Sequence, residues 1–259
     1  MHLARIAELL QPFLGSAIAA NGCHSEPGQR PGEEPAFLTP AQLQLISTYI
    51  DILLRWNARI NLTAIRDPED IVPRHFGESL FEARHLFPRL FAVSSVPALS
   101  EAEGSSVVKS LSPVSSVSPV VKPTAVADIG SGAGFPGIPL KLWAPEISLT
   151  LIESSHKKAT FLREVTRALT LTDINIQTAR AETLAGSQFD LVTLRAVDNF
   201  ATILPTAANL VTPNGRLALL IGSAQAQSAR SSLPAWTWQE PIPIPNSRSR
   251  LLLVAQRPQ

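Results

Sequence analysis

The stretch Ala127-Asp128-Ile129-Gly130-Ser131-Gly132-Ala133-Gly134-Phe135-Pro136-Gly137-Ile138-Pro139 decides the fold of this chain. Apolar residues lead into it, glycines follow at 130, 132 and 134, and prolines stand at 136 and 139. Glycine permits a positive φ and lets a ligand approach the backbone, and proline suits the first turn of a helix. The stretch therefore predicts a buried strand, a tight glycine turn and a helix that starts near Pro136. Such a turn binds nucleotide-like ligands at the carboxyl end of a strand.

The positions of the glycines relative to the end of the strand distinguish two kinds of nucleotide site. Residues 132–137 fit the pattern G-x-G-x-x-G of dinucleotide-binding proteins, but in that pattern the first glycine directly follows the strand. Here Gly130 follows the strand, and counted from it Phe135 stands where the third glycine is required. Asp128 would also lie near a pyrophosphate, which is unfavourable, whereas its carboxylate suits a ligand with a positively charged amino-acid end.

A second acidic residue strengthens this preference. Glu153 ends a predicted strand at 147–153, about twenty residues after the glycines, where a ribose-binding acid is expected. A carboxylate accepts hydrogen bonds from both ribose hydroxyls. An acid, a glycine turn and a second acid together form the pattern of an S-adenosylmethionine site. The alternative is an ordinary strand-turn-helix unit that binds no ligand.

Length and composition set limits on the class of protein. The chain has 259 residues, of which 45% are hydrophobic, which predicts one domain or one domain with an extension. The net charge of +1 favours no particular partner, so a nucleic-acid surface must come from local clusters. The single cysteine, Cys23, excludes an internal disulfide and predicts a cytoplasmic protein. No apolar run approaches the ~20 residues of a membrane span, and residues 3–14 have helical spacing rather than that of a signal segment.

The second half of the chain alternates strands and helices. Strands are predicted at 124–129, 147–153, 174–178, 189–195 and 215–221, and helices at 136–144, 155–169, 199–211 and 223–231. Such alternation implies a parallel, doubly wound sheet. The end of the chain instead predicts two strands with a short connection, which form an antiparallel hairpin at one edge. This arrangement is typical of methyltransferases rather than of the plain dinucleotide fold.

The first half of the chain is predicted to be helical. A helix at 3–14 and a loop at 19–36 precede a helix that Thr39 caps and that runs to about residue 58. Residues 55–79 mix arginines with Trp56 and His75, which suits phosphate contact and base stacking. Acidic residues nearly cancel this charge, so a packed helical cap with surface ion pairs is the alternative. Residues 92–123 are of low complexity and predict a mobile insertion, with a β-hairpin as the alternative.

Further motifs accompany the glycine turn: Asn61-Leu62-Thr63, Arg66-Asp67, Arg74-His75, Ser79, Phe161-Leu162, Arg180-Ala181-Glu182, Phe189-Asp190, Arg195-Ala196 and Pro243-Ile244-Pro245. Over residues 40–91 and 124–256 the chain thereby resembles the bacterial small-subunit ribosomal RNA methyltransferase G family, also called the glucose-inhibited division protein B family. The resemblance implies a Rossmann-like class I methyltransferase with a mostly parallel seven-stranded sheet. Its parts would be a helical extension at 1–91, the insertion at 92–123 and the core at 124–259.

The resemblance also implies an activity. The reaction would be the transfer of a methyl group from S-adenosylmethionine to N7 of a guanine in 16S rRNA, namely guanine 527 of the 530 loop. The partner would be this rRNA in the small ribosomal subunit or in an assembly intermediate, and we expect a monomer without membrane contact or metal. A small-molecule methyltransferase and a non-catalytic cofactor-binding assembly factor are the alternatives.

The site residues carry over by position. The cofactor contacts implied are Asp128, Gly130, Gly132, Gly134 and Phe135 of the turn, Glu153, Ser154 and Ser155 at the ribose, Ala181 and Glu182 at the adenine, and Arg195. Guanine N7 already carries a lone pair, so no general base is expected, and Arg195 would orient the target instead. Contacts with RNA are expected from Arg66, Arg74 and His75. On the residues alone, Arg195 is equally an ion-pair partner of Asp198 or Glu182.

Two positions depart from the family pattern. Ile221 stands where the family usually has a lysine, and Leu194 stands where it often has a serine. Both are expected near the face that receives the target, so the contacts with RNA are expected to differ there from the family pattern.

Overall fold

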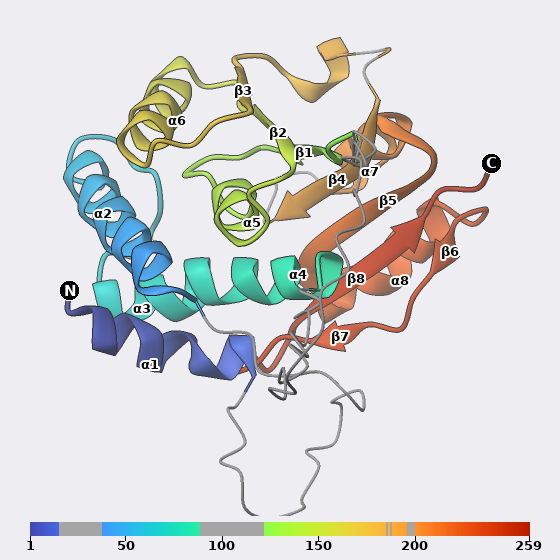
Figure 1. Cartoon of the computed structure of the whole chain (residues 1–259). Helices are drawn as coiled ribbons and strands as arrows, with labels where there is room; N and C mark the ends of the chain where they lie inside the picture. Colours follow the sequence, from blue (N-terminus) through green and yellow to red (C-terminus); the bar gives the residue numbers. More distant parts are fainter. Residues whose placement is uncertain (16–37, 89–121, 185, 187, 196–199) are drawn as a thin grey trace, which may run out of the picture.

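A mixed β-sheet forms the centre of the computed structural model, which describes residues 1–15, 38–88, 122–184, 186, 188–195 and 200–259 (Figure 1). The strand order is β3-β2-β1-β4-β5-β8-β6, and β7 also pairs with β8. Five strands are parallel: β1 (Ala125–Ile129), β2 (Ser148–Ile152), β3 (Ile174–Gln177), β4 (Phe189–Arg195) and β5 (Val211–Gly222). The last long strand, β8 (Arg250–Gln256), is antiparallel to β5. The predicted Rossmann-like methyltransferase sheet is thereby confirmed.

The edge of the sheet differs in one detail from the prediction. Where one strand was expected, the structure has two short ones, β6 (Thr237–Trp238) and β7 (Ile242–Pro243), so the described sheet has eight strands rather than seven. Both pair antiparallel with β8. Pro241 and Pro243 have no N–H to donate, which confines them to an edge and limits the ladder they can form.

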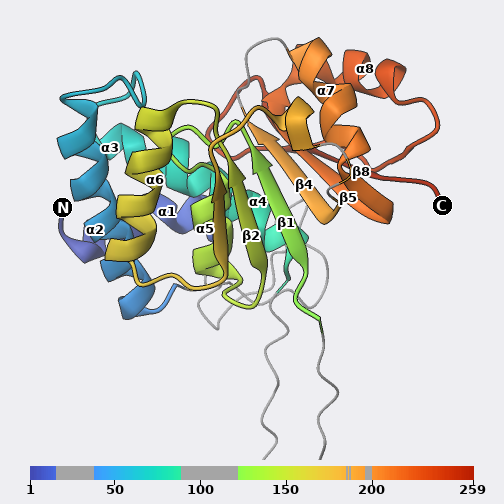
Figure 2. The same cartoon turned by 90° about the horizontal axis from the view of Figure 1, so that it is seen from above.

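Helices cover both faces of the sheet (Figure 2). One face carries α4 (Glu78–Leu86), α5 (Gly137–Trp143) and α6 (His156–Ala168), and the other carries α7 (Phe200–Asn209) and α8 (Ser223–Ser232). Each face of the sheet has its own hydrophobic core, and successive residues of β5 point alternately into the two. Ala218 and Leu220 belong to the core under α4, α5 and α6, whereas Leu219 and Ile221 belong to the core under α7 and α8. Strands that are buried on both faces explain the nearly continuous apolar runs in the sequence.

The N-terminal helices complete the first of these cores. They are α1 (Leu3–Leu14), α2 (Pro40–Asn57), the short α3 (Pro68–Ile71) and the π-helix η1 (Val72–Gly77). Thr39 caps α2 as predicted, because its side chain accepts a hydrogen bond from the backbone N–H of Gln42. Apolar side chains of α1 and α2 join those of α4, α5 and α6 in one cluster. The helical extension is therefore packed onto the face of the sheet that carries α5.

Two predictions fall on residues that the structure does not describe. They are the loop at 19–36 and nearly all of the insertion at 92–123. In the part of the chain that is described, no helix combines the length and the apolar character that crossing a membrane requires.

Candidate active site

The glycine turn joins β1 to α5 at the carboxyl edge of the sheet. Gly130, Gly132 and Gly134 have φ values of 69°, 55° and 83°, a backbone region that residues other than glycine rarely adopt. A Cβ atom at Gly134 would in addition collide with the Tyr49 hydroxyl and with Ile138. The prediction that this turn requires its glycines is confirmed, and the reason includes contacts with a helix far away in the sequence.

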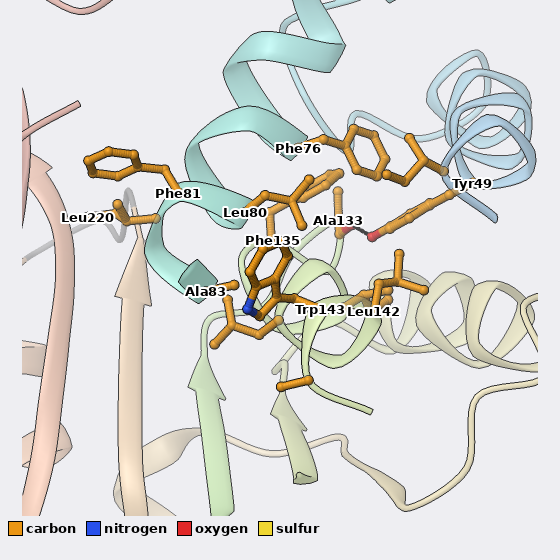
Figure 3. Close-up of a cluster of buried hydrophobic side chains, with 14 of the residues drawn as sticks. Tyr49, Phe76, Leu80, Phe81, Ala83, Ala133, Phe135, Leu142, Trp143 and Leu220 are labelled. Atoms are coloured by element: carbon orange, nitrogen blue, oxygen red, sulfur yellow. Dashed lines mark hydrogen bonds between the residues drawn. The ribbon is translucent and has the colours of Figure 1, made fainter. Parts of the chain in front are cut away.

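An aromatic cluster supports the turn from the side of the N-terminal helices (Figure 3). The Tyr49 hydroxyl donates a hydrogen bond to the carbonyl oxygen of Ala133, and its ring stacks on that of Phe135 with centroids 5.3 Å apart. Phe76 of η1 meets the Phe135 ring edge-on at 5.0 Å. No local signal in the sequence indicated the contact of Tyr49 with the turn, because Tyr49 and Ala133 are 84 residues apart.

Glu153 connects the turn to the next helix. One carboxylate oxygen accepts a hydrogen bond from the backbone N–H of Gly132 at 2.9 Å, and the other accepts one from Ser155 at 2.8 Å. The side chain is nearly buried, with a residue exposure of 6%. An ionised carboxylate has about four acceptor positions, so Glu153 keeps capacity for the two ribose hydroxyls that the sequence assigned to it.

A pocket of about 450 Å³ lies beside Glu153, at the ends of β1 and β2. Five of the predicted cofactor residues line it: Gly130, Glu153, Ser154, Ala181 and Glu182. The last two belong to a short 3-10 helix, η2 (Ala181–Leu184). Ala179, Arg180 and Ile203 also line the pocket and were not among the predicted cofactor residues. Arg180 belongs to the motif that includes Ala181 and Glu182 and could have been included, whereas no local signal marks Ala179 and Ile203. In the described ranges, no group of three or more histidine, cysteine, aspartate or glutamate residues is placed to hold a metal ion.

Asp128 lies beneath the turn and does not line this pocket. It is fully buried, and its Oδ2 accepts a hydrogen bond from the backbone N–H of Gly137 at 3.1 Å, at the start of α5. Burial raises the pKa of Asp128 to about 7, although the Gly137 contact lowers it. Its other oxygen has no hydrogen-bond partner in the described structure. Asp128 therefore supports the turn directly and has one acceptor oxygen left over.

Arg195 ends β4 and reaches over the glycine turn. Its guanidinium carbon lies 5.8 Å from the centroid of the Phe135 ring, and its Nη2 donates to the Arg74 carbonyl oxygen at 2.6 Å. The same nitrogen lies 3.4 Å from a carboxylate oxygen of Glu78, and the Arg195 side chain is only 7% exposed. Burial, followed by the nearby charge of Arg74, lowers the pKa of Arg195 to about 10.

This geometry corrects the partner expected for Arg195. The sequence suggested Glu182 or Asp198, whereas the ion pair is with Glu78, and Asp198 lies outside the described residues. Glu78 was missed because it belongs to the N-terminal half and meets β4 only after the helical extension has packed on the sheet.

His75 is packed between the turn and Arg195. Its ring stacks on Phe135 with centroids 4.9 Å apart, its Nδ1 accepts from Arg195 at 3.0 Å, and its Nε2 lies 2.8 Å from the Thr63 hydroxyl. Burial, Arg195 and Arg74 lower the pKa of His75 to about 3. The imidazole is therefore neutral, with Nε2–H donating to Thr63, and both nitrogens are engaged by protein groups.

The three predicted RNA contacts thus have different positions. The Arg74 side chain is 44% exposed, and Arg66 lies in an exposed loop where it donates to the Asn57 carbonyl oxygen at 3.2 Å. The two arginines reach the surface, whereas His75 is held against the glycine turn. Arg74 and His75 both belong to the π-helix η1, a conformation that is frequent at functional sites.

The two departures from the family pattern are not where they were expected. Leu194 is fully buried and Ile221 is 5% exposed, and both side chains belong to the core on the α7 and α8 face. The expectation that they lie at the face receiving the target is wrong. Strand alternation turns these two side chains into the core, while the next residue of β4, Arg195, points the other way.

Glu82 predicts a pH dependence of stability. It is fully buried on α4, where one carboxylate oxygen accepts a hydrogen bond from the Thr193 hydroxyl at 2.6 Å. Burial raises its pKa to about 8, with a smaller opposing effect of Thr193 and a contribution from Asp128. Because the folded protein keeps a proton that the unfolded chain has lost, its stability should fall as the pH rises from about 5 to 8.

Glu82→Gln should reduce this dependence, because glutamine can still accept from Thr193 but does not titrate. Thermal unfolding measured from pH 5 to 9 should show the variant gaining stability relative to the unmodified protein as the pH rises. Asp128 titrates in an overlapping window, so part of the slope should persist. Parallel curves for the two proteins over the whole range would contradict the assignment.

Comparison with known proteins identifies the family. The model of the family described as rRNA small subunit methyltransferase G matches residues 42–89 and 91–244, which is more than half of the chain. The chain belongs to this family. It is a Rossmann-like, S-adenosylmethionine-dependent methyltransferase, and the family acts on the RNA of the small ribosomal subunit.

Curated relatives support this membership over most of their length. A ribosomal RNA small subunit methyltransferase G from Roseiflexus sp. (strain RS-1) is 36% identical over 229 residues, which cover 84% of each chain. Another, from Xanthomonas axonopodis pv. citri (strain 306), is 32% identical over 81% of this chain and 84% of its own. Among solved structures, a ribosomal protein L11 methylase from Lactobacillus delbrueckii subsp. bulgaricus is 19% identical, with a TM-score of 0.47 over 54% of this chain and 73% of its own.

Proposed function

We propose that this protein transfers the methyl group of S-adenosylmethionine to N7 of a guanine in 16S rRNA, with guanine 527 of the 530 loop as the target. Membership of the family supports the class of RNA. The choice of N7 comes from the resemblance to the family, and the state of the groups around Arg195 supports it. Among the described residues there, His75 is neutral with both nitrogens engaged, and Asp128 and Glu82 are buried. Such a site suits an atom that already has a lone pair and requires no deprotonation.

The cofactor fits the pocket beside Glu153. Its ribose would be bound by Glu153, with Ser154 and Ser155 at the same end, and its adenine would lie beside Ala181 and Glu182. The amino-acid end would lie near Gly132 and Gly134, and Asp128, which is fully buried beneath the turn, would act by holding the turn through its contact with Gly137. When bound, the cofactor supplies an electrophilic methyl group on a sulfonium. The protein contributes binding and orientation, which is where the rate of such a transfer originates.

The target guanine is proposed to approach from the side of Phe135 and Arg195. Phe135 offers an aromatic ring beside the turn, and Arg195 offers donors that match the guanine O6 oxygen. Arg74 and Arg66 are exposed on the same N-terminal region and would contact the RNA backbone. His75 then acts by holding Arg195 rather than by touching RNA. We propose that the protein acts as a monomer on the rRNA, in the small subunit or in an assembly intermediate.

A methylation assay tests this proposal. The protein would be incubated with labelled S-adenosylmethionine and either naked 16S rRNA or 30S subunits, and the modified nucleotide would be located by borohydride and aniline scission, which cleaves at N7-methylguanosine. We expect one methyl group per RNA and scission at one guanine. Methylated RNA that resists scission would refute N7 as the acceptor. Cofactor binding without transfer to either substrate would favour the non-catalytic or small-molecule alternative.

A further inference from the structure

One carboxylate, that of Glu78, is shared by three arginines from three places in the chain. Its side chain is 4% exposed, and its two oxygens lie 3.1 Å from Arg74 Nη1 and 3.4 Å from Arg195 Nη2. Arg250 Nη2 contacts it as well. Arg250 begins β8 opposite Gly222, the last residue of β5, so the antiparallel direction of β8 brings it to the edge where the parallel strands end.

The charges in this cluster do not balance. Three guanidinium groups surround one carboxylate, which leaves an excess of two positive charges. Arg195 Nε and Arg250 Nε are also buried without a hydrogen-bond partner in the described structure. Buried donors on charged groups cost free energy unless they are paired. Glu82 and Asp128 also lie near Arg195, but burial raises the pKa of each carboxyl group to about 8 and about 7, so they supply less than full negative charge.

A cavity of about 470 Å³ adjoins the cluster. Arg74 and Glu78 line it together with Pro245 and Asn246 of the turn between β7 and β8, and residues of α1 close its far side. Two acidic residues, Glu8 and Asp70, line it as well. A ligand can therefore reach the arginines through Arg74, the most exposed of the three.

We propose that Arg74, Arg195 and Arg250 form a binding site for one phosphate group of the RNA backbone, and that Glu78 holds their guanidinium groups together in its absence. The inference rests on the proposed RNA substrate. Arginine forks bind phosphate through charge-assisted, bidentate hydrogen bonds, which matches both the excess charge and the unpaired Nε donors. Because Arg195 also lies over Phe135, a phosphate bound here belongs to the target nucleotide or to its neighbour. Arg250 and Glu78 thereby become positioning residues for the transfer.

The first test compares Arg250→Gln with a matched control. Arg248→Gln removes the same charge from an exposed residue of the same turn, two positions earlier. Binding of 16S rRNA would be measured over a range of salt concentrations, with the affinity for S-adenosylhomocysteine and the melting temperature measured in parallel. We expect Arg250→Gln to weaken RNA binding ~10-fold and to reduce the salt slope by ~1, while S-adenosylhomocysteine affinity stays unchanged. Equal RNA affinities and salt slopes for the two variants would overturn the site.

Glu78→Gln gives a result of opposite sign. It removes the anion that competes with phosphate, so we expect a lower melting temperature together with tighter binding of inorganic phosphate and RNA. A purely structural ion cluster predicts the lower melting temperature without any gain in phosphate or RNA affinity, and that outcome would overturn the inference.

Inorganic phosphate separates this inference from the proposed function. Calorimetry of the unmodified protein and of Arg250→Gln uses phosphate as the probe and requires no RNA. Phosphate binding that depends on Arg250, in a protein that methylates no rRNA, would support the site and refute the proposed function. Normal methylation with the same KM for RNA in Arg250→Gln and Arg248→Gln would retain the function and refute the site.

Discussion

Arg195→Ala is expected to lower the rate of methyl transfer ~10²-fold or more while leaving the fold intact, because a lost positioning group costs rate rather than structure. The structure explains why folding should tolerate the change. Glu78 would keep Arg74 and Arg250 as partners, so removal of Arg195 does not leave a buried carboxylate unpaired. The Arg74 carbonyl oxygen and His75 Nδ1 would lose their donor, so the melting temperature should fall moderately without loss of the fold. Arg195→Lys should not restore the rate fully, since a single ammonium cannot reproduce the planar fork.

Single-turnover methylation and melting temperature should be measured on the same preparations of Arg195→Ala. Arg163→Ala is a suitable control, because Arg163 is an exposed residue of α6 whose guanidinium donates to the Thr178 hydroxyl at 2.8 Å. The control should retain a normal rate. A large fall in melting temperature with near-normal turnover in Arg195→Ala would show that Arg195 serves the ion pair with Glu78 and not the reaction.

Glu153→Ala is expected to weaken binding of S-adenosylmethionine by at least ~100-fold. Each hydrogen bond to a charged group contributes about 1.5–3 kcal/mol, and the variant would lose those to both ribose hydroxyls. The change also removes the acceptors for the N–H groups of Gly132 and Ser155, so the melting temperature should fall as well. Calorimetry with S-adenosylhomocysteine and thermal unfolding measure the two effects separately.

The balance of the two effects decides the role of Glu153. Glu153→Gln should retain more stability than Glu153→Ala, because its amide oxygen can still accept one of the two backbone N–H groups. Glu240→Gln, at an exposed position near β7, is a control that should change neither quantity. Cofactor affinity within ~3-fold of normal in a destabilised Glu153→Ala variant would limit Glu153 to supporting the turn.

The glycine turn and the sheet around it were predictable because their signals are local. Glycines at 130, 132 and 134 indicate a turn with positive φ, and the structure has that turn. The spacing between the glycines and Glu153 placed this acid beside the turn. The alternation of predicted strands and helices indicated the parallel sheet, and two successive strands without a helix between them indicated its antiparallel end. The division of the edge strand was not predicted, although a local feature, the prolines at 241 and 243, accounts for it. In each case one short segment specifies its own backbone conformation.

Contacts between distant segments were not predictable from such patterns. Tyr49 holds the Ala133 carbonyl from 84 residues away, and Arg195 bonds to the Arg74 carbonyl across 121 residues. Comparison with the family pattern suggested that Leu194 and Ile221 lie near the face that receives the target. Strand alternation within the folded sheet instead placed both side chains in the core.

The sequence by itself therefore determined the class of fold, the turn and the acid at its ribose side, because glycine stereochemistry and hydrophobic periodicity act over a few residues. Only the tertiary structure decided which charges meet. Arg74 lies one helical turn before Glu78, so their contact is local, whereas Arg195 and Arg250 reach Glu78 because packing of the helical extension on the sheet, and the antiparallel direction of β8, bring their side chains to one edge. Beyond the i,i+4 spacing within a helix, charge attraction has no fixed spacing along a chain, so such distant partners are selected only when hydrophobic packing has brought the segments together.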